Sequence, residues 1–187
     1  MKRVAIFASG SGSNAENIHD FFKDNTEVEI SLVLTNNPNA FVLERAKKLK
    51  IPSLVFNREQ FTQTDYVVDA LHRNEIDFVV LAGFLWLIPQ NLIEAFPQAM
   101  VNVHPALLPK FGGKGMYGDN VHKAVVAQRE KETGITIHYV NQNYDEGAII
   151  FQAKTLVEST DTPEQVAAKV HQLEYKYFPK VIGELLS

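Results

Sequence analysis

Short apolar runs alternate with amphipathic segments along the first half of the chain. The runs are rich in Val, Ile, Leu and Phe, which suit buried strands, and the segments between them repeat apolar residues at helical spacing. This alternation is typical of βαβ units, in which a parallel sheet carries helices on both faces. The expected strands cover residues 4–8, 28–35, 53–56, 78–82 and 100–103, and the expected helices cover residues 14–23, 41–49, 65–73 and 90–95.

The second half of the chain departs from this alternation after Pro109. A glycine-rich segment, residues 111–118, precedes a helix that is expected to run to about residue 128. Residues 134–141 and 147–157 then have the character of a strand pair on the far side of the sheet. The predicted fold class is therefore α/β, a Rossmann-like, mostly parallel twisted sheet with helices on both faces and an antiparallel element toward the C-terminus.

The last helix has a recognisable start in Thr162-Pro163-Glu164-Gln165. Thr162 can accept a hydrogen bond from a backbone N–H of the first turn, Pro163 suits the first helical position, and Gln165 completes a capping box. We expect this helix to reach Glu174 or beyond.

Composition narrows the class of protein further. The 187 residues are 45% hydrophobic and 21% charged, and no linker or repeat divides them, so a single domain over residues 1–187 is expected. The net charge of −4 gives no basic surface for nucleic acid, which favours small-molecule ligands. The longest apolar run, residues 78–89, is about half of a membrane-spanning helix, so no membrane association is expected. The absence of cysteine fits a cytoplasmic protein. The protein is expected to be either a monomer or a homodimer.

The loop Ser9-Gly10-Ser11-Gly12-Ser13-Asn14 lies between the first expected strand and the first expected helix. Free backbone N–H groups and the positive end of a helix dipole meet there, which favours phosphate. A Walker loop is excluded because no lysine follows Gly12, and a dinucleotide site is disfavoured because residues 35–38 supply no acid for a ribose. Serine hydroxyls and the Asn14 amide suit a compact phosphomonoester. The alternative is a plain tight turn with Ser13 or Asn14 as the helix cap.

Asn102 and His104 stand two residues apart at the end of an apolar run. In an extended backbone such residues project from the same face, so the amide and the imidazole are expected to reach one point. An amide donor beside a proton-transfer group suits acyl transfer, and the alternative is a strand end whose polar side chains cap loop backbone. Asp145, at the end of a later loop, can bring an acid to the same sheet edge.

Three sequence motifs in this order resemble those of the phosphoribosylglycinamide formyltransferases, a folate-dependent family of purine biosynthesis. The motifs are the Gly-Ser-Gly-Ser-Asn loop, Asn102-x-His104-Pro105-x-Leu107-Leu108-Pro109, and Gly134-x-Thr136-x-His138 with Asp145-x-Gly147. The resemblance covers nearly the whole chain. It implies transfer of the formyl group of 10-formyltetrahydrofolate, the co-substrate, to the amine of 5-phosphoribosylglycinamide.

The same resemblance implies two groups of binding residues. Glu174 is expected to contact the phosphorylated substrate, with a solvated helix acid as the alternative. Arg58 is expected near both ligands, with an ordinary loop cation as the alternative. Trp86 stands where relatives often carry arginine, so the resemblance does not define the contacts to the glutamate tail of the folate. The expected phosphate-binding residues are Ser11, Gly12, Ser13 and Asn14, and the expected folate-binding residues are Arg58, Leu85, Trp86, Leu87, Ile88, Asn102, Asn141 and Tyr144.

The resemblance assigns the catalytic roles to Asn102, His104 and Asp145. Formyl transfer passes through a tetrahedral species in which the formyl oxygen gains negative charge and the attacking nitrogen gains positive charge. Asn102 is expected to bond that oxygen. His104 is expected to act as a cationic donor to it and then as the proton source for the departing N10, and Asp145 to raise the pKa of His104. The alternative for His104 and Asp145 is a purely structural pair.

The remaining histidines are expected to matter less, with one exception. His19 and His72 are expected on exposed helix faces, His122 near a helix start and His171 within the last helix. His138 is the exception, because it shares a strand face with Thr136, and the two are expected to support the catalytic residues from behind. No metal is expected, since neither cysteine nor a His-x-x-x-His spacing is present.

The segment after the His104 motif carries two further expectations. The Leu108-Pro109 peptide bond is expected to be cis, as the family favours. The glycine-rich residues 112–118 are expected to form either a mobile flap or a passive surface turn.

Other functions share parts of this pattern. A formyltransferase acting on methionyl-tRNA or a nucleotide sugar would share Asn102, His104 and Asp145, but the tRNA enzyme is expected to need a further domain and a basic surface. A formyltetrahydrofolate hydrolase is expected to carry an N-terminal regulatory domain, whereas the motifs here begin at the N-terminus. A non-catalytic nucleotide-binding module would need only the Gly-Ser loop.

Overall fold

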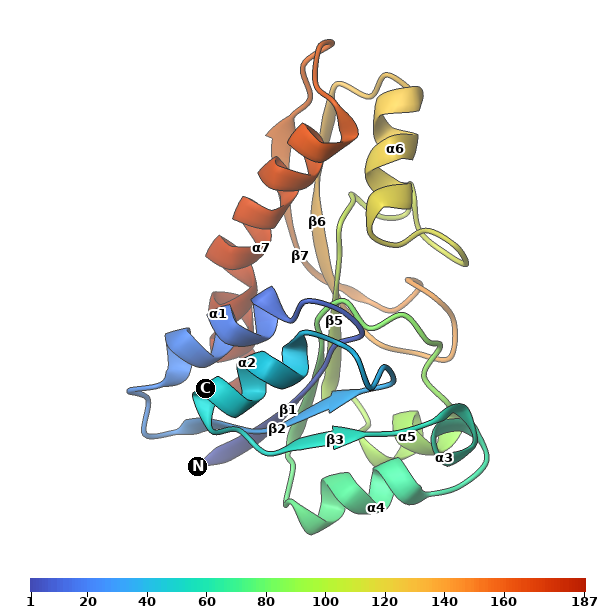
Figure 1. Ribbon diagram of the computed structural model, residues 1–187. Helices are drawn as coiled ribbons and strands as arrows, with labels where there is room; N and C mark the ends of the chain where they lie inside the picture. The colour runs from blue at the N-terminus through green and yellow to red at the C-terminus, as the bar shows by residue number, and fades with distance from the viewer.

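Seven strands form one sheet in the order β3-β2-β1-β4-β5-β6-β7 (Figure 1). The computed structural model describes residues 1–187. β1 to β5 run parallel to one another, whereas β6 is antiparallel to β5 and β7 is antiparallel to β6. The predicted α/β class is therefore confirmed, including the antiparallel element toward the C-terminus. The strands are β1 (Lys2–Phe7), β2 (Val28–Thr35), β3 (Ser53–Val55), β4 (Phe78–Leu81), β5 (Met100–His104), β6 (Glu132–Tyr139) and β7 (Ile149–Leu156).

Helices cover both faces of the sheet because alternate strand residues feed two separate apolar cores. In β1, Val4 and Ile6 belong to the larger core, and Ala5 and Phe7 belong to the smaller one. Residues of α1, α2, α6 and α7 complete the larger core, and residues of α3, α4 and α5 complete the smaller core. The helices are α1 (Ser13–Phe22), α2 (Val42–Leu49), α3 (Arg58–Thr62), α4 (Tyr66–Arg73), α5 (Gln90–Ala95), α6 (Asp119–Ala127) and α7 (Pro163–Leu186).

The start of α7 confirms the predicted capping box. The Thr162 side chain accepts a hydrogen bond from the backbone N–H of Gln165, and the Gln165 side chain accepts one from the backbone N–H of Thr162. The helix runs beyond Glu174 to Leu186, and its inner face packs into the larger core. None of the helices combines the length and the apolar character that crossing a membrane requires.

Two features differ from the sequence prediction. Residues 58–62 form the short helix α3, which the sequence analysis left out, and a capping box between Asn57 and Gln60 starts it. The strand pair also differs from the predicted ranges, since β6 begins earlier, at Glu132, and ends earlier, at Tyr139, and β7 begins later, at Ile149. The residues between them form a loop, and its end requires glycine at position 147, since a Cβ there would lie 1.6 Å from the carbonyl oxygen of Tyr139.

The segments that contain the sequence motifs lie together at the carboxyl ends of the parallel strands. β1 pairs with β2 on one side and with β4 on the other, so the strand order reverses between β1 and β4. In open α/β sheets ligands bind in the crevice outside the strand ends at such a reversal. The fold therefore predicts a ligand site between the loop after β1, the segment after β4 and the end of β5.

Candidate active site

A cavity of about 940 Å³ lies along this edge of the sheet. Its wall is built by the loop after β1, the segment after β4, the end of β5, the glycine-rich segment before α6, the β6–β7 loop and α7. Thr136 is buried beneath the cavity and does not line it. The other residues expected at the site line it together, namely Ser11, Gly12, Ser13, Asn14, Arg58, Leu85, Trp86, Leu87, Ile88, Asn102, His104, His138, Asn141, Tyr144, Asp145 and Glu174.

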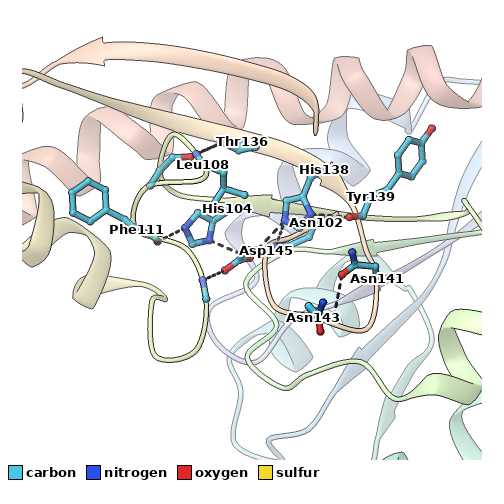
Figure 2. A network of polar contacts seen from close by, with 12 residues as sticks. Asn102, His104, Leu108, Phe111, Thr136, His138, Tyr139, Asn141, Asn143 and Asp145 are labelled. Atoms are coloured by element: carbon cyan, nitrogen blue, oxygen red, sulfur yellow. Dashed lines mark hydrogen bonds and ion pairs between the residues drawn. The ribbon is translucent and has the colours of Figure 1, made fainter. Parts of the chain in front are cut away.

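Asn102 and His104 lie on one face of β5, as their spacing predicts. The antiparallel ladder places His138 of β6 opposite Asn102 and Thr136 opposite His104. Directly opposite residues of neighbouring strands share a face of the sheet. Figure 2 shows the side chains of Asn102, His104 and His138 converging on Asp145, which comes from the β6–β7 loop.

His104 is buried, with 3% of its surface exposed, and both of its ring nitrogens face acceptors. Nε2 lies 2.7 Å from the carbonyl oxygen of Phe111, and Nδ1 lies 3.4 Å from Oδ1 of Asp145. Only the protonated ring can donate to both acceptors. Burial opposes that charge and lowers the pKa of His104, although the Asp145 carboxylate and the Phe111 carbonyl raise it. Asp145 thus raises the pKa of His104, as expected, but burial outweighs the carboxylate and the net shift is downward.

Asp145 is held in place by its backbone and by three polar neighbours. Its φ of 57° lies in the left-handed region, which costs a non-glycine residue roughly 1 to 2 kcal/mol. Oδ2 accepts a hydrogen bond of 3.0 Å from the backbone N–H of Gly113, and Oδ1 lies 3.6 Å from Nε2 of His138. Although burial alone would raise the pKa of Asp145, the contacts with the His138 and His104 rings and the hydrogen bond from Gly113 lower it below its ordinary value. The carboxyl is therefore ionised at neutral pH.

The amide of Asn102 is oriented by His138. Nδ1 of His138 lies 2.8 Å from the carbonyl oxygen of Tyr139 and must donate to it, so Nε2 of the neutral ring is an acceptor. The side-chain nitrogen of Asn102 lies 3.1 Å from this Nε2 and donates to it. An amide nitrogen carries two hydrogens, so one N–H of Asn102 remains for a ligand in the cavity.

Thr136 supports the turn that follows His104 from below. Its hydroxyl donates to the carbonyl of Ala106 at 2.7 Å and accepts from the backbone N–H of Leu108 at 3.0 Å. Gln152 of β7, which the sequence analysis did not single out, donates to the same hydroxyl and to the carbonyl of Leu108. The Leu108-Pro109 peptide bond within this turn is cis, as predicted.

The loop after β1 leaves the start of α1 without a side-chain cap. Gly12 occupies the cap position with a φ of 71° and offers no side chain. Among the N–H groups of the first turn, only that of Ser13 bonds a side chain, donating to the Ser11 hydroxyl at 3.4 Å. The alternative in which Ser13 or Asn14 caps the helix is therefore wrong, because both side chains belong to the helix itself. Uncapped N–H groups at a helix start that faces a cavity suit an anionic ligand.

Glu174 closes the same end of the cavity and is not a solvated acid. It is 5% exposed and accepts hydrogen bonds from the side-chain nitrogen of Asn14 at 2.8 Å and from Nδ1 of His171 at 3.1 Å. The hydrogen bond to Glu174 raises the pKa of His171. His122 of α6, only 3% exposed, also lines this end, and burial lowers its pKa.

Both His122 and His171 line the cavity, a placement that was not expected from the sequence. The spacing of three residues between His171 and Glu174 on one helix was the sequence signal for their contact. His72 is exposed, as expected, whereas His19 is half-buried on α1. The glycine-rich segment contacts His104 through the carbonyl of Phe111 and Asp145 through the N–H of Gly113. These are backbone contacts, so the identities of the side chains could not predict them.

The opposite end of the cavity is aromatic. Phe84 and Trp86 line it, and the buried rings of Phe56 and Phe61 pack behind them, with ring centroids in the cluster 4.9 to 6.4 Å apart. The guanidinium carbon of Arg58 lies 4.4 Å from the centre of the Trp86 ring, a cation–π contact. Arg58 stands in the first turn of α3 and not in a loop. This end suits a flat aromatic ligand with an anionic tail near Arg58.

The fold and the site define an α/β ligand-binding protein equipped for acyl transfer, with an amide, an imidazole and a carboxylate at the carboxyl edge of a parallel sheet. The chain belongs to the Formyl transferase family, which matches residues 2–182. The resemblance found in the sequence is thus confirmed.

Proteins of known sequence and structure extend this result. The phosphoribosylglycinamide formyltransferase of Bacillus subtilis is 37% identical, over 100% of this chain and 95% of that protein. The chloroplastic one of Arabidopsis thaliana is 42% identical over 98% of this chain, which spans 65% of that longer protein. The structure of glycinamide ribonucleotide transformylase 1 from Geobacillus kaustophilus matches with a TM-score of 0.91 and 33% identity over the full length of both chains.

Proposed function

We propose that the chain transfers the formyl group of 10-formyltetrahydrofolate to the amine of 5-phosphoribosylglycinamide, a step of de novo purine biosynthesis. The observation that carries the proposal is a single cavity that has an uncapped helix start at one end and an aromatic wall at the other. The names of the relatives from Bacillus subtilis and Arabidopsis thaliana support the same pair of substrates.

The phosphorylated substrate fits the end formed by α1 and α7. The backbone N–H groups of residues 11–14 are suited to its phosphate, and the Glu174 carboxylate is suited to hydroxyl groups of its ribose. The folate fits the aromatic end, where Trp86 and Arg58 offer a ring face and a positive charge. Bound in this way, the amine and the formyl carbon meet at the end of β5.

The reaction joins the amine nitrogen to the formyl carbon and breaks the bond from that carbon to N10. The free N–H of Asn102 can bond the oxygen on which negative charge develops, and losing one such donor typically costs roughly 3 to 4 kcal/mol. The attacking nitrogen must lose a proton and N10 must gain one. His104, whose pKa burial lowers, can take the proton from the amine as a neutral imidazole and deliver it to N10.

Enzymatic assay tests this function directly. Purified protein is mixed with 5-phosphoribosylglycinamide and a 10-formylfolate donor, and the deformylated product is followed by absorbance. We expect turnover by the wild type and loss of nearly all of it in His104→Ala, whereas the exposed His72→Ala variant keeps wild-type rates. No turnover by the wild type would refute the proposal, and formylation of methionyl-tRNA or of an amino sugar nucleotide instead would establish a rival acceptor.

Two further expectations remain part of the proposal. One is a cytoplasmic location, which is proposed from the sequence. The relative from Arabidopsis thaliana differs in being named chloroplastic. The choice between a monomer and a homodimer can be made by sedimentation.

A further inference from the structure

Two carbonyl groups of the loop after β1 are bonded from α2, outside the cavity. The backbone N–H of Val42 donates to the carbonyl of Gly10 at 3.1 Å. The side-chain Nε of Arg45, one turn further along α2, donates to the carbonyl of Ser11 at 2.8 Å. Each of these carbonyls belongs to the same planar peptide unit as the N–H of the next residue.

In a trans peptide unit the C=O and N–H point in opposite directions. The bond from Val42 therefore turns the N–H of Ser11 away from α2, and the bond from Arg45 turns the N–H of Gly12 away from it. Residues 10–14 line the cavity, and no residue of α2 does. Successive N–H groups that point to one side form an anion-binding concavity.

The packing between α2 and the loop leaves little freedom for another arrangement. A Cβ on Gly12 would lie 2.3 Å from Cγ2 of Val42, so the loop and the start of α2 are in direct contact. Arg45 is itself held, because its guanidinium forms an ion pair with Glu16 and lies 5.1 Å from the centre of the Phe41 ring.

Arg45 also offsets the negative charge of Glu16 near the loop. Glu16 is the acid in the first turn of α1, close to where an anion would bind, and its negative charge repels a phosphate there. Arg45 and Lys48 both pair with Glu16 and offset this charge, but only Arg45 also bonds the loop. Lys48 is exposed and forms its hydrogen bond with Glu16 and none with residues 9–14, so it serves as a matched control.

We propose that Arg45 is a positioning residue for the substrate phosphate, which directs the N–H of Gly12 into the cavity by bonding the carbonyl of Ser11. This proposal rests on the phosphate-binding part of the proposed function. The directed bond from Nε is the essential element, and a positive charge near Glu16 does not replace it.

The test measures phosphate binding separately from turnover. Inorganic phosphate is titrated into the wild type, Arg45→Met, Arg45→Lys and Lys48→Met, and the backbone amide signals of residues 11–14 are followed by NMR. We expect the dissociation constant of phosphate to rise roughly tenfold in Arg45→Met, to stay raised in Arg45→Lys, and to change less than about twofold in Lys48→Met. In kinetics, the KM for 5-phosphoribosylglycinamide should rise in Arg45→Met while kcat and the KM for the folate stay near wild-type values.

The outcomes separate this proposal from the proposed function. Unchanged phosphate affinity in Arg45→Met, or full recovery in Arg45→Lys, overturns the positioning role even if the wild type is active. Conversely, a wild type that binds phosphate in an Arg45-dependent manner but transfers no formyl group leaves this role intact and removes the enzymatic assignment. Equal increases in the KM for the folate and the KM for the phosphorylated substrate would show general damage to the fold and would also overturn the positioning role.

Discussion

The side-chain nitrogen of Asn102 lies 3.1 Å from Nε2 of His138, directly across the ladder between β5 and β6. The carbonyl of Tyr139 holds the proton of His138 on Nδ1, which leaves Nε2 as the acceptor. One N–H of Asn102 is therefore committed to His138, and the other keeps a defined direction into the cavity.

Replacing His138 with phenylalanine should impair catalysis by freeing the Asn102 amide. The ring volume is retained but the acceptor is lost, so we expect kcat to fall about tenfold while both KM values change less than about twofold. His138→Gln can still offer an oxygen to Asn102 and should recover part of the rate. Steady-state kinetics on both variants provides the measurement, and an unchanged kcat in His138→Phe would contradict the positioning role.

Replacing Asp145 with asparagine should change the pH dependence of the reaction. The Asp145 carboxylate raises the pKa of His104 against the effect of burial, so its removal lowers that pKa further. The acid limb of the kcat profile should move to lower pH, and the maximal kcat should fall on the order of a hundredfold. NMR titration of the His104 ring in Asp145→Asn checks the direction of the shift.

The neighbouring Glu146 offers a control for this change, because it is an exposed acid on the same loop. Glu146→Gln should leave the profile where it is in the wild type. A shift of the acid limb toward higher pH in Asp145→Asn would be incompatible with the roles assigned to burial and to the carboxylate.

Stability should depend on pH through His171. The hydrogen bond to Glu174 raises the pKa of His171 in the folded state, so the folded chain binds the proton more tightly than the unfolded chain. This contribution is fully present below the unfolded pKa of about 6.5 and is lost as the pH rises through the folded value. His171→Gln should therefore lower the free energy of unfolding in mildly acidic solution and have less effect at alkaline pH.

Urea unfolding of His171→Gln and wild type at several pH values tests this dependence. The exposed His72→Gln variant serves as the control, since no carboxylate contact is present at His72. A destabilisation by His171→Gln that increases with pH would show that the sign is wrong.

Two glycine substitutions should have opposite effects on stability. A Cβ at Gly134 of β6 would lie 1.8 Å from the carbonyl oxygen of Ala153 in β7, so Gly134→Ala must push the strands apart at a cost of about 3 kcal/mol. At Gly183 of α7 the nearest atom lies at 3.6 Å, an ordinary contact with Phe22. Gly183→Ala should stabilise the chain by up to about 1 kcal/mol, because alanine favours a helix. Thermal unfolding of both variants tests this prediction, and equal changes in their unfolding temperatures would contradict the geometry.

Local patterns in the sequence determined much of the fold. The parallel strands, the helices α1, α2, α4 and α5, and the capped start of α7 follow from apolar periodicity and from residues such as Thr162 and Gln165, because these depend on near neighbours in the chain. The shared face of Asn102 and His104 likewise follows from the period of a strand. The short helix α3 escaped prediction because five residues are too few to show a helical period, although Asn57 and Gln60 mark its start.

Tertiary structure alone decided what surrounds the side chains of Asn102 and His104. The antiparallel pairing of β6 with β5 places His138 against Asn102, and the left-handed backbone of Asp145 turns its carboxyl toward His104. The pKa of His104 depends on how deeply the assembled elements bury it, a quantity that its neighbours in sequence do not contain. The contacts of Glu174 with Asn14, and of Arg45 with Ser11, join segments far apart in the chain. The sequence by itself thus determined which chemical groups are available and on which elements they lie, whereas long-range packing decided their partners, their burial and their charge.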